Sequence, residues 1–189
     1  MKICLTGGIA CGKSLLSSFL NGLGVETLDA DDVVHELVPE DERRRLAKVV
    51  FRDPAARKAL EARLHPLVRK RFADWLERRD SKGADAAPSA GPEVPPLRVA
   101  VIPLLFEVHW ERDYDIILCI TSSRERQIER MVETRGYTLE EAEARLAAQM
   151  DVSEKAARSH YVIRNDGSSE QLKEGATRLV AWLKEQVTR

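Results

Sequence analysis

The sequence Gly-Gly-Ile-Ala-Cys-Gly-Lys-Ser occupies residues 7–14, and this stretch decides the fold. A glycine, four residues and then Gly-Lys-Ser form the P-loop pattern, in which a glycine-rich loop binds phosphate. The short apolar run at residues 2–6 is typical of a buried parallel strand, and residues 14–20 place Leu and Phe at helical spacing. The order of strand, glycine loop and helix is the one that phosphate binding requires.

Each residue type in the loop has a physical role. Gly7 and Gly12 permit backbone conformations and close approaches that a side chain would forbid. The loop N–H groups then point inward and, with the N-terminus of the following helix, form an anion site. Lys13 places a positive charge on the β- and γ-phosphates, and the Ser14 hydroxyl is a ligand for Mg²⁺. The pattern therefore predicts ATP and Mg²⁺. The candidate nucleotide-binding residues are Gly8, Ile9, Ala10, Cys11, Gly12, Lys13, Ser14 and Leu15, and Ser14 is also the candidate metal ligand.

Composition limits the class of protein. The chain has 189 residues, of which 43% are hydrophobic, enough for one domain with a sizeable core. Thirty basic against 31 acidic residues give a net charge of −1, which gives no support for a nucleic-acid partner. No apolar run approaches the ~18 residues of a membrane helix. Three scattered cysteines and an N-terminus that leads straight into a strand favour a cytoplasmic protein.

Strands and helices alternate along the chain. Further buried strands are expected near residues 25–28, 98–102, 115–120 and 161–163, with helical patterns between them. This alternation predicts an α/β fold of the P-loop NTPase kind. Such a fold has three layers, with a parallel sheet of about five strands covered by helices on both faces.

Helix starts are marked by capping patterns. Ser122, Thr138 and Ser168 are each followed three residues later by Glu or Gln, the signature of a capping box. They predict a helix to about residue 133, a second to residue 150 and a last amphipathic helix. Asp53 before Pro54 predicts another start, and that helix is expected to be interrupted near His65-Pro66.

Ligands of parallel sheets bind at the carboxyl ends of the strands. The P-loop, Asp29–Asp31 and residues 103–107 all follow predicted strands, so we expect them to converge. A carboxylate opposite the γ-phosphate can accept the proton of an attacking hydroxyl, or hold Mg²⁺ through water. Asp31 is the candidate for such a role, whereas Asp32 is better explained as a helix cap.

Five arginines follow the predicted strand at 115–120. Arginines of a closing flap stabilise the charge that spreads over a transferred phosphoryl group. Most helical arginines are merely solvated, so we expect only two or three of these to touch phosphate. The five are Arg124, Arg126, Arg130, Arg135 and Arg145.

Motifs in this order and spacing resemble those of the dephospho-CoA kinase family, nearly from end to end. The most specific are Leu64-His65-Pro66 and Pro103-Leu104-Leu105-Phe106-Glu107, which are not general P-loop features. The others are Leu5-Thr6-Gly7-Gly8-Ile9, Asp29-Ala30-Asp31, Gln127 with Arg130, Arg145-Leu146-Ala147-Ala148-Gln149, Lys155, and Asn165-Asp166-Gly167.

The resemblance implies a reaction and a set of site residues. ATP would phosphorylate the ribose 3′-hydroxyl of the small-molecule substrate dephospho-CoA, giving coenzyme A and ADP, and Asp31 would be the base. Asn165 would lie near the adenine of ATP. The implied catalytic residues are Asp31, Lys13, Arg130 and Arg145, and the implied substrate-binding residues are Asp31, His65, Leu105 and Glu107.

The same resemblance organises the chain as one kinase domain, residues 1–189. Within it we expect a helical acceptor-binding insertion at 32–79, a flexible loop rich in Pro, Gly, Ala and Ser at 80–97, and a lid region at 122–150. The insertion includes short helices over 32–38 and 40–50.

Two departures from the family pattern keep other hypotheses open. The connection before Val50-Phe51 is shorter than usual, and Thr134, with Arg135 beside it, stands where a second lid arginine is usual. The alternatives are a kinase for another nucleoside or nucleotide, and a nucleotide-binding module without turnover. The oligomeric state is not predicted.

Overall fold

The computed structural model describes residues 1–41, 53–78 and 96–188, and the structural statements below concern these residues. The helix predicted over residues 40–50 and the loop predicted over residues 80–97 lie outside the described ranges, apart from residues at their ends.

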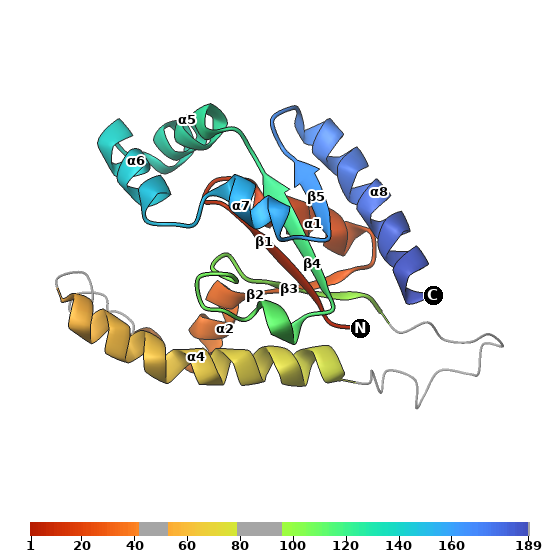
Figure 1. Ribbon diagram of the computed structural model, residues 1–189, viewed down its shortest axis with the longest axis horizontal. Coiled ribbons are helices and arrows are strands. Elements are labelled where there is room, and N and C mark those ends of the chain that lie inside the picture. The colour runs from red at the N-terminus through yellow and green to blue at the C-terminus, as the bar shows by residue number, and fades with distance from the viewer. Residues whose placement is uncertain (42–52, 79–95, 189) are drawn as a thin grey trace. The chain divides into compact units, whose positions relative to one another are not determined.

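The described strands form one five-stranded sheet of order β2-β3-β1-β4-β5 (Figure 1). β1 pairs in parallel with β3 and β4, and β4 pairs in parallel with β5. The register places Leu5 of β1 beside Val101 of β3 and Leu118 of β4. The strands are β1 (Ile3–Gly7), β2 (Glu26–Asp29), β3 (Arg98–Val101), β4 (Ile116–Thr121) and β5 (Tyr161–Arg164). The predicted parallel α/β fold is confirmed.

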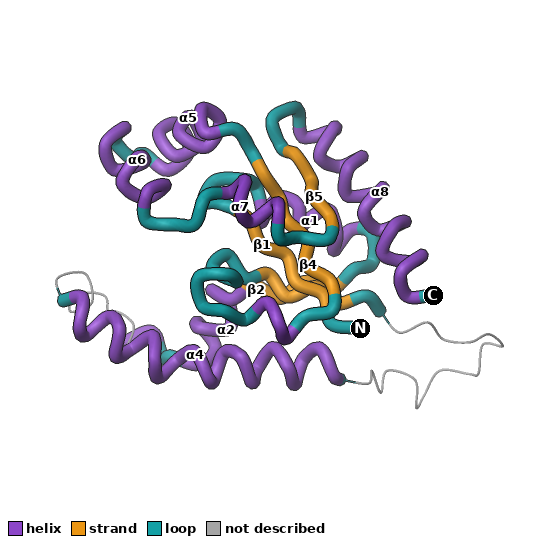
Figure 2. Tube along the Cα trace, in the orientation of Figure 1, coloured by secondary structure: helices purple, strands orange, loops and turns teal. Residues whose placement is uncertain are grey.

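A loop with a short 3-10 turn joins β3 to β4, and the other successive strands are joined by helices (Figure 2). They are α1 (Lys13–Gly22), α2 (Ala30–Leu37), α4 (Pro54–Glu77), α5 (Arg124–Arg135), α6 (Leu139–Ala147), α7 (Val152–Ala157) and α8 (Ser169–Val187), with a 3-10 turn, η1, at Glu111–Asp113. In the described part of the chain, no helix combines the length and apolar character needed to cross a membrane.

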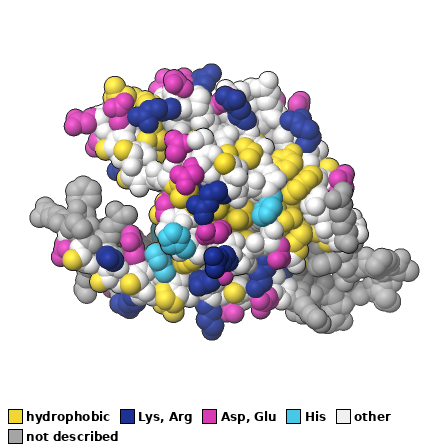
Figure 3. Space-filling view, viewed as in Figure 1, with side chains coloured by type: hydrophobic (Ala, Val, Ile, Leu, Met, Phe, Trp, Pro, Cys, Tyr) yellow, Lys and Arg dark blue, Asp and Glu magenta, His cyan; other side chains and the backbone are white. Residues whose placement is uncertain are grey.

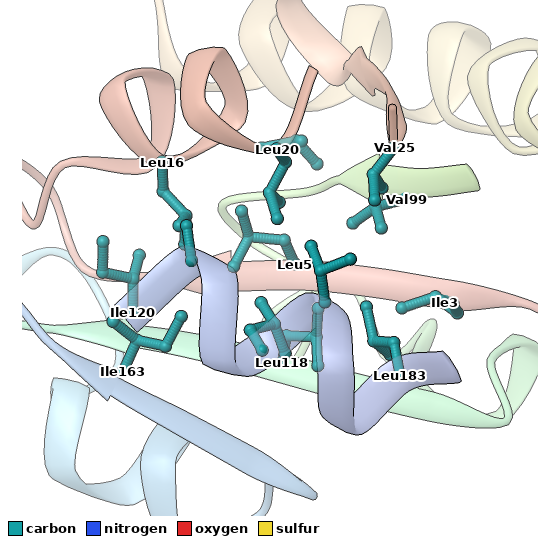
Figure 4. Packing of buried hydrophobic residues seen from close by; sticks show 14 of the residues in the cluster. Ile3, Leu5, Leu16, Leu20, Val25, Val99, Leu118, Ile120, Ile163 and Leu183 are labelled. Carbon is teal, nitrogen blue, oxygen red and sulfur yellow. The ribbon is translucent and has the colours of Figure 1, made fainter. Parts of the chain in front are cut away.

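The chain divides into two compact units, Met1–Thr27 with Leu97–Arg189 and Leu28–Pro96. In the first unit, α1 and α8 pack together against the sheet, and α7 contacts β1 and β4. Strand side chains on one face of the sheet are buried beneath α1 and α8 (Figure 4). Helices cover both faces of such a parallel sheet, so its strands are apolar on both faces. The labelled members of this core are Ile3, Leu5, Leu16, Leu20, Val25, Val99, Leu118, Ile120, Ile163 and Leu183.

The second unit consists, in its described part, mainly of α2 packed against α4. The buried apolar residues of this described part are Val33, Val38, Val68 and Phe72. An ion pair joins the two helices, with Arg71 Nε 2.9 Å from Glu36 Oε2.

The predicted interruption near His65-Pro66 is wrong, because α4 runs for 24 residues with Pro66 inside it. Proline lacks the N–H that would bond the carbonyl oxygen four residues earlier, at Ala62. The surrounding turns are rich in Ala, Leu, Arg and Lys, which are strong helix formers. The predicted start is confirmed, since the Asp53 side chain accepts from Ala55 N and Ala56 N.

Two of the three predicted capping boxes are confirmed, at Thr138 for α6 and Ser168 for α8. The third prediction is wrong by one residue: Ser123 caps α5, accepting from Arg126 N. The Ser122 hydroxyl is instead buried against Asn165 and Asp166. The helix predicted to reach residue 150 ends at Ala147, and α7 begins after its own cap, Asp151.

One face of the molecule shows how the surface charges are distributed. Basic and acidic side chains are interspersed on the face that Figure 3 shows. This matches the near balance of 30 basic and 31 acidic residues in the sequence.

Candidate functional site

Backbone geometry shows why two positions of the loop are glycine. Gly7 has φ 154° and Gly12 has φ 101°, both in the region that side chains disfavour. A Cβ on Gly7 would lie 2.4 Å from the Ile120 carbonyl oxygen, and one on Gly12 would lie 2.3 Å from Asn165 Nδ2. The loop is therefore packed closely against the ends of β4 and β5 in a way that only glycine allows.

Lys13 begins α1 and folds back over the loop. Its ammonium donates to the carbonyl oxygens of Gly7 at 3.0 Å and Gly8 at 2.8 Å. Ser14 and Leu15 are exposed at the start of the same helix. A cation and a hydroxyl thus lie beside a helix N-terminus, the arrangement that binds phosphate.

Side chains of the predicted lid region hold the loop at Ile9. The Gln127 amide donates to the Ile9 carbonyl oxygen at 2.7 Å, and Ile9 N donates to Gln149 Oε1 at 3.1 Å. Gln127 is 3% exposed, so its amide is committed to this contact. The loop is thereby tied to α5 and to the segment after α6.

The end of β5 holds the loop from another side. The Asn165 amide donates to the Cys11 carbonyl oxygen at 2.8 Å, and Asn165 is 6% exposed. The Arg130 guanidinium donates to the carbonyl oxygens of Ala10 at 3.1 Å and Asn165 at 2.7 Å. Burial raises the pKa of the Cys11 thiol, so this loop residue is a neutral, packed side chain.

Asp166 fixes the start of α5. Its Oδ1 lies 2.9 Å from the Ser122 hydroxyl and accepts from Ser123 N at 2.6 Å, while Arg164 Nε donates to its Oδ2. The Arg164 guanidinium is the main reason that the pKa of Asp166 is lowered to about 2, with the Ser123 N–H next in importance. The carboxylate is thus ionised throughout the neutral range.

Two cavities lie beside the loop. The one over Lys13 has a volume of about 200 Å³ and is lined by Ala10, Gly12, Lys13, Ser14, Leu15, Arg130, Thr134 and Arg135. The other has a volume of about 290 Å³. It is lined by Gly8, Ile9, Ser122, Ser123, Arg124, Gln127, Leu146, Gln149, Met150, Asp151 and Val152.

The five arginines are distributed unequally around these cavities. Arg130 and Arg135 line the one over Lys13, and Arg124 lines the larger one. Arg126 pairs with Glu129 at 2.7 Å on the surface of α5. Arg145 lines neither cavity, and its guanidinium lies 4.3 Å from the centre of the Tyr137 ring.

The loop after β3 carries an ion pair between a fully buried lysine and a glutamate that is 22% exposed. Lys155 is 0% exposed, and its ammonium lies 2.7 Å from Glu107 Oε1 and donates to the Pro103 carbonyl oxygen at 2.8 Å. Met150 N donates to the same Glu107 oxygen at 3.2 Å, while Glu107 Oε2 is buried without a hydrogen-bond partner. Leu105 is 0% exposed in the core, so it can shape this loop but does not present its side chain.

Asp31 and His65 both belong to the unit Leu28–Pro96. Asp29, not Asp32, is the helix cap: its Oδ1 accepts from Asp31 N at 2.9 Å. Asp31 is exposed in the first turn of α2, and His65 lies half-buried near the middle of α4.

Sequence reasoning missed the partners that hold the loop in place. Gln149 and Lys155 were noted only as parts of matching motifs, and Ser122 only as a cap. Their roles depend on contacts with Ile9, Glu107 and Asn165, which are distant in sequence. A buried lysine has no sequence signal apart from its position in an apolar helix face.

The family is decided by a comparison with protein-family models. The dephospho-CoA kinase model matches residues 1–43 and 40–171. The chain belongs to the dephospho-CoA kinase family. The two matched segments overlap at residues 40–43.

Individual dephospho-CoA kinases agree with this assignment. The one from Symbiobacterium thermophilum is 36% identical over 188 residues, covering 88% of this chain and 74% of that protein. The one from Wolinella succinogenes is 34% identical over 203 residues, covering 96% of this chain and 94% of that protein. A solved structure from Thermus thermophilus is 33% identical with a TM-score of 0.74 and covers 97% of both chains.

Proposed function

We propose that this chain transfers the γ-phosphoryl group of ATP to the ribose 3′-hydroxyl of dephospho-CoA, giving coenzyme A and ADP. Membership in the dephospho-CoA kinase family carries this proposal. The P-loop geometry supports the donor half of the reaction, because the loop, Lys13 and a helix N-terminus are positioned together.

The loop and its supports would bind the donor. Backbone N–H groups of the loop and the Lys13 ammonium would contact the phosphates, where negative charge builds up during transfer. Asn165, Gln127 and Arg130 would keep the loop in shape, since each bonds a loop carbonyl oxygen. A preformed loop needs no reorganisation when the charge develops.

Mg²⁺ fits the donor set at this site. Ser14 offers an exposed hydroxyl beside Lys13, and Mg²⁺ commonly takes one or two protein ligands together with phosphate oxygens and water. Among the described residues, no group of three or more His, Cys, Asp or Glu side chains could hold a metal by itself. Bound Mg²⁺ would neutralise phosphate charge, with Ser14 as its protein ligand.

Asp31 would act as the general base. Its carboxylate is exposed at the first turn of α2, so it can accept a proton from the attacking hydroxyl of a substrate. Asp29 caps the helix, which leaves Asp31 without a capping task.

The acceptor is the second substrate of the proposed reaction. His65 of α4 would contact it, and Glu107 and Leu105 would shape the loop after β3. Arg145 would act from the lid region at residues 122–150, and residues 32–79 would serve as the shortened acceptor-binding subdomain. The three cysteines are free thiols, which supports a reducing cytoplasm as the site of action.

The test is ADP release by the purified protein with Mg·ATP, with and without dephospho-CoA, and mass detection of the product. Acceptor-dependent ADP and a product heavier by one phosphate are the expected results. ATP binding without acceptor-dependent turnover would contradict the proposal. A preference for a plain nucleoside monophosphate would replace it with another small-molecule kinase.

A further inference from the structure

We infer that Arg135, rather than Arg130, is the arginine of α5 that contacts the phosphates of bound ATP. The inference rests on the proposed function, because it adds a contact to the same donor site. Two arginines of one helix then have different roles: Arg130 positions the loop, and Arg135 contacts the phosphates of ATP.

Arg130 lines the same cavity, but three of its guanidinium hydrogen bonds go to the protein. A guanidinium has five N–H donors in a rigid plane. Nη1 of Arg130 donates to the Ala10 carbonyl oxygen at 3.1 Å and to the Ser122 hydroxyl at 3.2 Å, and Nη2 donates to the Asn165 carbonyl oxygen at 2.7 Å. Because Ala10 is 8% exposed and Asn165 is 6% exposed, turning Arg130 toward a ligand would strip two buried residues of a hydrogen bond.

Arg135 lies in a different situation on the same helix. It is exposed and lines the cavity of about 200 Å³ together with Lys13 and Ser14, the two side chains expected to meet the phosphates and Mg²⁺. Within the described residues, its guanidinium makes no hydrogen bond or ion pair. A planar guanidinium can donate two parallel hydrogen bonds to phosphate oxygens. Arg135 can therefore contact the phosphates while the hydrogen bonds of Arg130 go to the protein.

The neighbouring residue on the helix, Thr134, cannot make the same contact with the phosphates. Thr134 follows Arg130 by one turn and also lines the cavity, but its side chain is uncharged and short. Arg135 is the last residue of α5 before Gly136, which ends the helix with φ 68°. A long side chain from the final turn can reach the cavity although it is rotated by ~100° from Thr134.

A competing explanation is that Arg135 only stabilises the C-terminus of α5 through the helix dipole. The two explanations predict different measurements. A dipole role affects thermal stability and leaves ATP affinity unchanged, whereas a phosphate contact affects ATP affinity and leaves folding intact.

The experiment measures ATP affinity by calorimetry, KM for ATP and for dephospho-CoA, and Tm for Arg135→Ala, Arg135→Lys and Arg126→Ala. Arg126 is the matched control, because it lies on the same helix, lines neither cavity and pairs with Glu129. We expect Arg135→Ala to lose at least about tenfold in ATP affinity with KM for dephospho-CoA unchanged, Arg135→Lys to lose less, and Arg126→Ala to match the wild type.

A rescue variant sharpens the result. Adding Thr134→Arg to Arg135→Ala should restore most of the ATP affinity, because position 134 lines the same cavity. ATP affinity of Arg135→Ala within twofold of the wild type, or an equal loss in Arg126→Ala, would overturn the inference. If the wild type binds ATP but does not phosphorylate dephospho-CoA, the proposed function fails while the loss in Arg135→Ala still supports the phosphate contact.

Discussion

The two units of this protein hold their polar side chains in opposite ways. In the unit that carries the P-loop, polar residues such as Gln127, Lys155 and Asn165 are buried and bonded to the backbone. In the unit Leu28–Pro96, the prominent candidates are exposed or half-buried: Asp31 lies in the first turn of α2, and His65 lies on α4. The buried polar groups fit the proposed preformed cradle for the nucleotide, and the exposed Asp31 fits the proposed base for the acceptor.

Asp31→Asn should have the largest effect if this division holds. Turnover should fall by about 10²- to 10⁴-fold, since an amide cannot take up the proton of the acceptor hydroxyl. Asp32→Asn is the matched control, one residue along the same exposed turn, and should retain activity. Steady-state ADP release measures both variants, and equal activity in the two would remove Asp31 as the base.

Lys13→Ala should lower turnover by about 10²- to 10³-fold, because it removes the cation that the loop holds over the phosphate site. Lys173→Ala, an exposed lysine of α8, is the control for loss of one positive charge. Kinetics at saturating and limiting ATP would measure the effect. A Lys13→Ala protein with normal kcat and KM would show that the cradle does not bind the nucleotide as proposed.

Lys155→Met should destabilise the fold by about 3 kcal/mol, the lower end for a buried pair, because it leaves the partly buried Glu107 carboxylate without its cation. The double variant with Glu107→Gln should recover part of the loss. Lys70→Met is the comparison in the other unit, where the pair with Asp74 is 4.0 Å long and exposed, and it should have a much smaller effect. Urea unfolding measures all three, and similar losses at Lys155 and Lys70 would contradict the contrast between the units.

Asp166→Asn should have the smallest effect and a distinct pH dependence. The folded-state pKa of Asp166, about 2, lies below the ordinary value of 3.8, so its contribution is present above about pH 4 and lost as pH falls toward 2. At pH 7 the variant should be less stable by about 1–2 kcal/mol, allowing for partial solvent screening. Unfolding free energies from pH 2 to 7 should converge at the acidic end, and parallel curves would exclude the ionised carboxylate as the cause.

Local signals explain why most of the fold could be predicted from the sequence. The P-loop, the buried strands and the caps at Asp53, Thr138 and Ser168 depend on neighbouring residues. The interruption predicted at Pro66 was wrong because one missing hydrogen bond does not end a helix of 24 residues. The helix cap predicted at Ser122 was wrong because its hydroxyl is hydrogen-bonded to Asp166, which lies 44 positions away in sequence.

The candidate site could be predicted only in part. The sequence places the loop residues and Arg130 among the candidates, but the contacts that hold Arg130 to Ala10 and Asn165 join segments far apart in sequence. No local pattern indicates which of several arginines lines a cavity and which pairs with a neighbour, as Arg135 and Arg126 do. Such roles emerge only after the sheet brings the segments together.

The most direct test of the division between the two units is ATP affinity, measured by calorimetry on Asp31→Asn and Lys13→Ala beside the wild type. The account predicts that Asp31→Asn binds ATP as the wild type does while losing turnover, and that Lys13→Ala loses both. Equal loss of ATP affinity in the two variants, or full turnover in Asp31→Asn, would contradict it.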